Sequence, residues 1–114
     1  MKSEEQGKMK TPDPLLLEEI VSRIKNTVRP RKIILFGSAV RQEMDRDSDL
    51  DFLIVMPEGA HRRNTAKKVY RALRGLDVSK DIIVVTEKDV AEHKDNPSLV
   101  LHPAMAEGRE LYAA

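Results

Sequence analysis

Residues 33–55 read IILFGSAVRQEMDRDSDLDFLIV, and this stretch decides which fold the rest of the chain can adopt. It contains two largely apolar, β-branched runs, Ile33–Phe36 and Leu50–Val55, which predict two strands. The connection between them is polar, opens with glycine and serine, and closes with two aspartates. Such a pattern predicts a polar site at the edge of a small sheet.

The two ends of this connection carry different chemistry. Side chains alternate along a strand, so Asp49 and Asp51 share one face, with Cα atoms roughly 6.6 Å apart. Paired carboxylates suit hard divalent cations that clamp the oxygens of a phosphoryl displacement. Gly37 has no Cβ, so the backbone there can turn sharply and approach a phosphate, while Ser38 adds a hydroxyl and an N–H donor. The stretch therefore predicts a phosphate-binding turn followed by metal-binding carboxylates.

This pattern, Gly37-Ser38 followed after ten residues by Asp49-x-Asp51, resembles the signature of the DNA polymerase β-like nucleotidyltransferase superfamily. The strings GSAVRQ and SDLDFLIV are most similar to the minimal nucleotidyltransferases of toxin–antitoxin systems, which are often paired with a HEPN-domain protein. The resemblance covers residues 16–112. It implies an α/β (α+β) nucleotidyltransferase fold, a small mixed sheet with helices mainly on one face and the site on the other.

The resemblance also implies roles for three carboxylates. Asp49 and Asp51 would bind two Mg²⁺ ions, and a third aspartate on a neighbouring strand would complete one ion and help to deprotonate the attacking hydroxyl. Asp81 is the candidate for this third role, because it heads a β-branched run as Asp51 does. Asp77, four residues earlier, is its competitor.

Three further residues are assigned to the nucleotide by the same resemblance. Gly37 and Ser38 would hold the β- and γ-phosphates of a nucleoside triphosphate, with ATP as the expected co-substrate. Arg41 matches the arginine of the family's GSxxR pattern, and it either contacts phosphate or pairs with one of Asp45, Asp47 and Asp49; the sequence leaves both open. The family often continues with glycine where this chain has Gln42, which bears on the loop and not on the catalytic positions.

Rival motifs fail on spacing. An EF-hand loop that starts at Asp45 needs glycine and glutamate where the chain has Leu50 and Met56, and one that starts at Asp47 needs glycine where the chain has Phe52. No Walker A pattern is present, and no two histidines have the i, i+4 spacing of a helical zinc site. These mismatches exclude calcium-loop, ordinary P-loop and zincin chemistry.

Composition sets the remaining limits. The 114 residues predict one domain over residues 13–114, after a polar, aperiodic tail over residues 1–12. Cysteine is absent and no apolar run approaches the ~20 residues that a membrane span needs, so we expect a cytoplasmic protein without a membrane partner. The net charge of +1 gives no global bias toward nucleic acid, which is possible but not favoured.

The pattern along the chain predicts alternating helices and strands. Asp13-Pro14 is typical of a helix start and Arg29-Pro30 of a helix end. Helices are predicted over residues 14–28, 37–44, 62–74, 87–94 and 98–107, and strands over residues 32–36, 49–56 and 81–85; residues 110–112 form an edge strand or simply pack.

The helix over residues 62–74 has a strongly basic outer surface. Its apolar face is expected to hold Ala66, Val69, Tyr70 and Leu73. The basic surface is either an ordinary solvated face or a dock for an acidic partner or nucleic acid. Because no aromatic residues are interleaved with the cations, single-strand binding is disfavoured.

The sequence thus predicts a Mg²⁺-dependent enzyme that moves a nucleotidyl group, most simply AMP from ATP, to a hydroxyl. The alternative is a non-catalytic antitoxin that neutralises a HEPN-type partner by binding. Leu53 and Val55 share the face of Asp49 and Asp51, so we expect apolar surface beside the site that a HEPN-type partner or a second copy covers.

Overall fold

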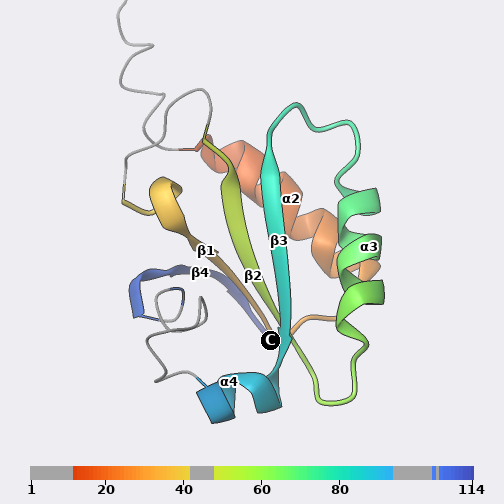
Figure 1. The fold of residues 1–114 in the computed structure, drawn as a ribbon. Helices are drawn as coiled ribbons and strands as arrows, with labels where there is room; N and C mark the ends of the chain where they lie inside the picture. Colours follow the sequence, from red (N-terminus) through yellow and green to blue (C-terminus); the bar gives the residue numbers. More distant parts are fainter. Residues whose placement is uncertain (1–11, 42–47, 94–103, 105) are drawn as a thin grey trace, which may run out of the picture.

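The computed structural model describes residues 12–41, 48–93, 104 and 106–114, and the fold is drawn in Figure 1. The expected tail over residues 1–12 lies almost entirely outside the described residues, as do the end of the helix predicted over 37–44 and most of the helix predicted over 98–107. The elements in chain order are α2 (Pro14–Thr27), β1 (Lys32–Phe36), the 3₁₀ turn η1 (Gly37–Ala39), β2 (Leu50–Met56), α3 (Arg62–Ala72), β3 (Lys80–Thr86), α4 (Glu87–His93) and β4 (Arg109–Ala113).

Four strands form one mixed sheet in the order β3-β2-β1-β4. β1 lies at the centre, antiparallel to both β2 and β4, whereas β2 and β3 run parallel. Parallel neighbours need a crossover, and α3 supplies it on one face of the sheet. The predicted mixed sheet is confirmed, and residues 110–112 belong to an edge strand.

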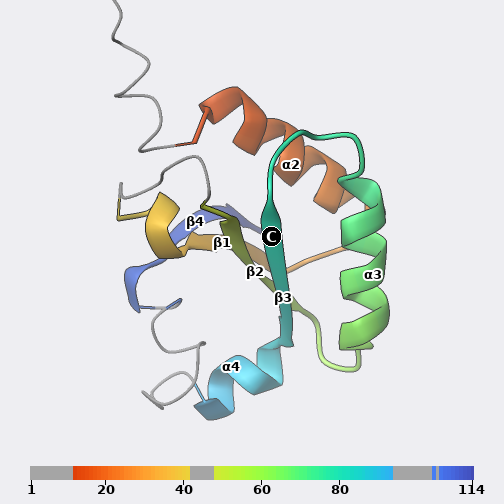
Figure 2. The same ribbon diagram turned by 45° about the horizontal axis from the view of Figure 1, so that its top comes forward.

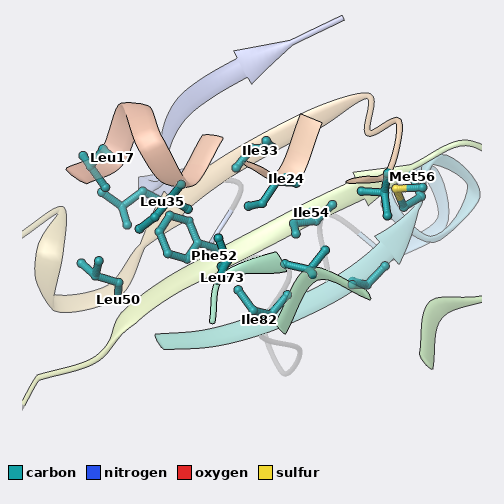
Figure 3. Close-up of a cluster of buried hydrophobic side chains, with 14 of the residues drawn as sticks. Leu17, Ile24, Ile33, Leu35, Leu50, Phe52, Ile54, Met56, Leu73 and Ile82 are labelled. Atoms are coloured by element: carbon teal, nitrogen blue, oxygen red, sulfur yellow. The ribbon is translucent and has the colours of Figure 1, made fainter. Parts of the chain in front are cut away.

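Helices α2 and α3 cover the same face of the sheet (Figure 2). The core between them takes alternate residues of the two central strands, among them Ile33, Leu35, Phe52 and Ile54, as Figure 3 shows. Ile24 of α2 is fully buried against this face. Burial of alternate strand residues is what a sheet with one helix-covered face requires.

Side-chain hydrogen bonds cap the first turns of α2 and α4. The Asp13 side chain accepts a hydrogen bond of 2.9 Å from the Leu15 N–H, and Pro14 occupies the first helical position of α2. At α4 the Thr86 Oγ1 accepts from the Asp89 N–H, while the Asp89 carboxylate accepts from the Thr86 N–H at 2.9 Å. Thr86 and Asp89 therefore form a capping box at the start of α4.

The opposite face of the sheet is covered by the chain itself. Leu53 and Val55 are buried in a second cluster with Ile34 and Phe36, to which Ala104 and Val90 of α4 also contribute. The expectation of exposed apolar surface at Leu53 and Val55 is therefore wrong, because segments far along the chain return to cover it. These two residues give no reason for a partner to cover the face.

One side chain of α3 lies elsewhere than its helical spacing predicts. Tyr70 is 42% exposed, whereas Val69 and Leu73 are fully buried and Thr65 is buried beside them. The tyrosine ring reaches past the helix toward the outer edge of β3, where its hydroxyl accepts a hydrogen bond of 2.9 Å from the Ile82 N–H. The prediction that Tyr70 lies on the buried face of the helix is therefore wrong. Its hydroxyl instead lies at the edge of β3, close to Asp81.

Within the described part of the chain, no helix is long and apolar enough to cross a membrane.

Candidate active site

The predicted site residues meet at one end of the sheet because of the strand register. Phe36, the last residue of β1, pairs with Asp51 on β2, and Asp51 pairs with Asp81 on β3. Residues paired across neighbouring strands point to the same face, so Asp51 and Asp81 share the face opposite α2 and α3. Asp49, two residues before Asp51, extends the row. Three carboxylates and the turn after β1 therefore gather at this corner.

Gly37 lies directly against one of these carboxylates. Its φ angle is +79°, in the region that side chains other than glycine rarely adopt. A Cβ at this position would collide with Oδ2 of Asp51. The chain therefore needs glycine here twice over, for its backbone angle and for the space that the Asp51 carboxylate occupies.

The residues after Gly37 form one tight turn rather than a described helix. The Gly37 carbonyl accepts from the N–H groups of Val40 at 3.1 Å and Arg41 at 3.3 Å. Ser38 is half-buried within this turn, and Arg41 is exposed. The helix predicted over residues 37–44 is seen as a single 3₁₀ turn, its remainder lying outside the described residues.

The surroundings of Asp51 disfavour its charged form. Burial, then the charge of Asp81, then that of Asp49 raise the pKa of Asp51 above its ordinary value, and the Arg41 charge opposes them. A negative neighbour raises the pKa of a carboxyl because ionising that carboxyl then costs work against the neighbour's charge. Because the charge of Arg41 lowers the pKa of Asp51, Arg41 lies near Asp51. Neither of the two alternatives that the sequence offers for this arginine includes Asp51. Asp77 contributes nothing comparable, so Asp81 is the better candidate for the third carboxylate.

Asp81 has a further neighbour that sequence reasoning missed. Its Oδ1 lies 3.4 Å from the Tyr70 hydroxyl, which is the same hydroxyl that accepts from Ile82. At 3.4 Å this contact is long for an O–H···O bond, so it orients the carboxylate only weakly. A tyrosine two turns into a basic helix gives no local signal that it will reach a strand edge.

The donor set fits Mg²⁺ in kind, since hard carboxylate oxygens are the ligands that this ion prefers. A bound cation would offset the repulsion from Asp81 and Asp49 that, after burial, raises the pKa of Asp51. In the conformation described, however, residues 12–41, 48–93, 104 and 106–114 hold no group of three acidic or histidine side chains close enough to bind one ion. A site with three ligands would require side-chain rotation, for which Asp81, exposed and loosely held by Tyr70, has the freedom.

Another hollow in the protein carries no comparable chemistry. A groove of about 390 Å³ between α2 and β4 is lined by residues such as Leu17, Val21 and Leu111. None of the three aspartates lines it, and α2 places it on the opposite face of the sheet. The carboxylate corner is therefore the better candidate for catalysis.

Comparison with known proteins adds independent evidence. The family model described as "Nucleotidyltransferase domain" matches residues 16–101. No curated protein matches the sequence. Among solved structures, a candidate nucleotidyltransferase from Sulfolobus solfataricus is similar with a TM-score of 0.59 and 21% identity, over 87% of this chain and 79% of that one. A mutant of the toxin–antitoxin MntA-HpeT is similar with a TM-score of 0.58 and 18% identity, over 86% of this chain and 73% of that one.

The structural likenesses, at this level of identity, establish the fold, and the family model extends over most of the strands and helices that build the carboxylate corner. Sequence, fold and site geometry thus agree: the chain belongs to the nucleotidyltransferase domain family.

Proposed function

We propose that this protein transfers a nucleotidyl group, AMP from ATP in the simplest case, to a hydroxyl on a partner protein, with Mg²⁺ as cofactor. The observation that carries the proposal is the cross-strand pairing of Asp51 with Asp81, directly beside the Gly37 turn. This arrangement places acidic groups next to a turn whose backbone can approach phosphate closely.

Each residue has a task in this reaction. Gly37 and Ser38 hold the β- and γ-phosphates through backbone N–H groups and the serine hydroxyl, and Arg41 adds positive charge at the same turn. Asp81 accepts the proton of the acceptor hydroxyl, whose oxygen then bonds to the α-phosphorus while the bond to pyrophosphate breaks. Asp49 and Asp51, with Asp81, would hold Mg²⁺, which would offset the negative charge that develops during the transfer.

Asp81 is the group best suited to the proton transfer. It is exposed at the outer strand of the sheet, whereas Asp51 is half-buried between its neighbours. An acceptor that approaches over β3 therefore reaches Asp81 first. The weak Tyr70 contact leaves the Asp81 carboxylate free to rotate toward it.

A protein acceptor is supported by the MntA-HpeT likeness, because that solved structure is a toxin–antitoxin. That mutant also replaces two aspartates, two positions apart, by glutamate, which is the spacing of Asp49 and Asp51. For this chain we propose a HEPN-type partner, or a second copy, as the molecule that presents the hydroxyl. The chain's own residues already cover the apolar face, so the partner's role is to bring the acceptor.

The alternative is a binding module that neutralises its partner without catalysis. It predicts that the carboxylate corner is dispensable. The raised Asp51 pKa argues against this, because a module without catalysis has no need to hold mutually repelling carboxylates together.

The test is a transfer assay with ATP labelled on the α-phosphate, run with Mg²⁺ or with a chelator. The protein is assayed alone and with the product of the adjacent open reading frame. We expect label to appear on the partner in the presence of Mg²⁺ and not with chelator or with Asp51→Asn. Neutralisation of the partner without any labelling, unaffected by Asp51→Asn, would establish the binding module instead.

A further inference from the structure

The outer face of α3 carries a shallow basic groove directly beside Asp81. Lys67, Tyr70, Arg71 and Arg74 line this hollow of about 240 Å³. We call these four residues the α3 groove. Tyr70 joins it to the candidate site, because the Tyr70 hydroxyl lies 3.4 Å from Oδ1 of Asp81.

The cations of the α3 groove have no carboxylate partners in the described part of the chain. Other basic residues do: Arg62 pairs with Asp89 at 2.9 Å, and Lys32 with Glu110 at 3.4 Å. Lys67, Arg71 and Arg74 make no such ion pair with the residues that the structure describes, and all three are exposed. Their charge is therefore available to a second molecule.

The backbone holds these cations in a fixed row. Lys67 and Arg71 are one turn apart on α3, and Arg74 follows in the turn at its end, so the row spans roughly 10 Å. Arg23 of α2 donates to the Arg74 carbonyl at 3.0 Å and to the Ala72 carbonyl at 3.2 Å, which fixes the end of α3. A row of this kind is preorganised for carboxylates with matching spacing.

From these contacts we infer that the α3 groove docks an acidic segment of the acceptor protein and so guides its hydroxyl over the edge of β3 to Asp81. The inference rests on the proposed function and identifies the surface of this chain to which the acceptor protein binds. An acidic acceptor would be repelled by Asp49, Asp51 and Asp81, and the basic row offsets that repulsion on the side where Asp81 is exposed.

The size and composition of the groove favour a protein segment over other anions. Its volume lies below the roughly 300–1,000 Å³ of small-molecule sites, so it accommodates one or two side chains rather than a whole nucleotide. A single strand of nucleic acid needs successive aromatic platforms, and Tyr70 is the only aromatic residue among the four that line the groove. An acidic peptide needs only the row of cations.

Adjacent lysines supply a matched pair of variants. Lys67 lines the groove, whereas Lys68 is equally exposed on the same helix but does not line it. Lys67→Glu and Lys68→Glu change the net charge equally. We expect the first to weaken binding of a fluorescent poly-glutamate peptide by about tenfold or more at low salt, and the second by less than about twofold.

The binding assay contains no nucleotide triphosphate and no metal. Binding of the poly-glutamate peptide is compared with binding of oligoadenylate, which stands for nucleic acid. Equal losses in the two lysine variants, or no peptide binding by the wild type, would overturn the inference. Tighter, Lys67-dependent binding of oligoadenylate would overturn it in favour of nucleic acid. Asp51→Asn should still bind the peptide, so loss of transfer with intact peptide binding separates a failed catalytic proposal from a failed docking surface.

Discussion

Gly37 and the Asp51 carboxylate compete for the same space, and this contact can be tested with glycine variants. Gly37→Ala and Gly59→Ala both place a side chain at positive φ, which costs about 1–2 kcal/mol of folding free energy. Only Gly37→Ala also adds a Cβ that meets Asp51, since nothing lies within 4 Å of the corresponding atom at Gly59. Denaturant unfolding should therefore show a loss for Gly37→Ala that exceeds the Gly59→Ala loss by about 1 kcal/mol or more. Equal losses would contradict the close approach of Gly37 to Asp51.

The raised pKa of Asp51 predicts how the metal-free protein responds to pH. A carboxyl whose pKa is higher in the folded state than in the unfolded state favours folding when protonated, and this contribution disappears as pH rises through the folded pKa. Asp51→Asn removes the penalty, so in chelator the variant should be more stable than wild type near pH 7. The gain should stay below about 1 kcal/mol, because the carboxyl is partly exposed, and should vanish as pH falls toward 4. A variant less stable than wild type at pH 7 would contradict the unfavourable environment of the Asp51 charge, which arises first from burial and then from Asp81 and Asp49.

Helix α4 should depend on the capping carboxylate of Asp89, whose effect on stability changes with pH in the opposite sense to that of Asp51. The Thr86 backbone N–H, the Thr86 hydroxyl and the nearby Arg62 hold the pKa of Asp89 below its ordinary value against the opposing effect of burial. Its contribution to stability is present above the ordinary pKa and is lost as pH falls through the folded pKa. Asp89→Ala should cost about 1 kcal/mol at pH 7, and this cost should shrink only as pH falls below about 4, through the lowered pKa of Asp89. Glu92→Ala on the same helix, which removes only a 3.8 Å contact to His93, is the control and should cost little. Equal costs at pH 7 would contradict the capping role of Asp89.

Elements with strong local signals could be predicted from the sequence, and their long-range consequences could not. Proline and the Asp13 cap locate α2, and glycine at a positive φ of +90° follows α3 at Gly75. Tyr70 was placed on the buried face because its spacing from Val69 and Leu73 is helical, whereas its long side chain reaches the edge of β3 instead. Helical spacing predicts the direction in which a side chain leaves the helix axis. It does not predict that a backbone N–H at a strand edge will donate a hydrogen bond to the hydroxyl of that side chain.

The prediction that differs most from the structure concerns the sheet face opposite α2 and α3. Leu53 and Val55 were expected to be exposed on this face, but they are buried. Leu53 and Val55 alternate correctly with the residues that α2 and α3 cover, so the strand was predicted well. Val90 and Ala104, which lie much later in the chain, pack in the same cluster as these two residues. No local sequence pattern predicts such a long-range contact. By contrast, the family resemblance led to Asp81 on a strand beside Asp51, and the register pairs these two residues. The roles of these residues remain predictions.

In the proposed function, the Gly37 turn and the paired Asp51 and Asp81 form one nucleotide site. Calorimetric titration with a non-hydrolysable ATP analogue and Mg²⁺ tests this site without any acceptor. Asp81→Asn and Asp77→Asn form a matched pair, each removing one exposed charge four residues apart. We expect Asp51→Asn and Asp81→Asn to lose Mg²⁺-dependent affinity by about tenfold or more, while Asp77→Asn binds as wild type. Unchanged affinity in Asp51→Asn and Asp81→Asn, or an equal loss in Asp77→Asn, would contradict it.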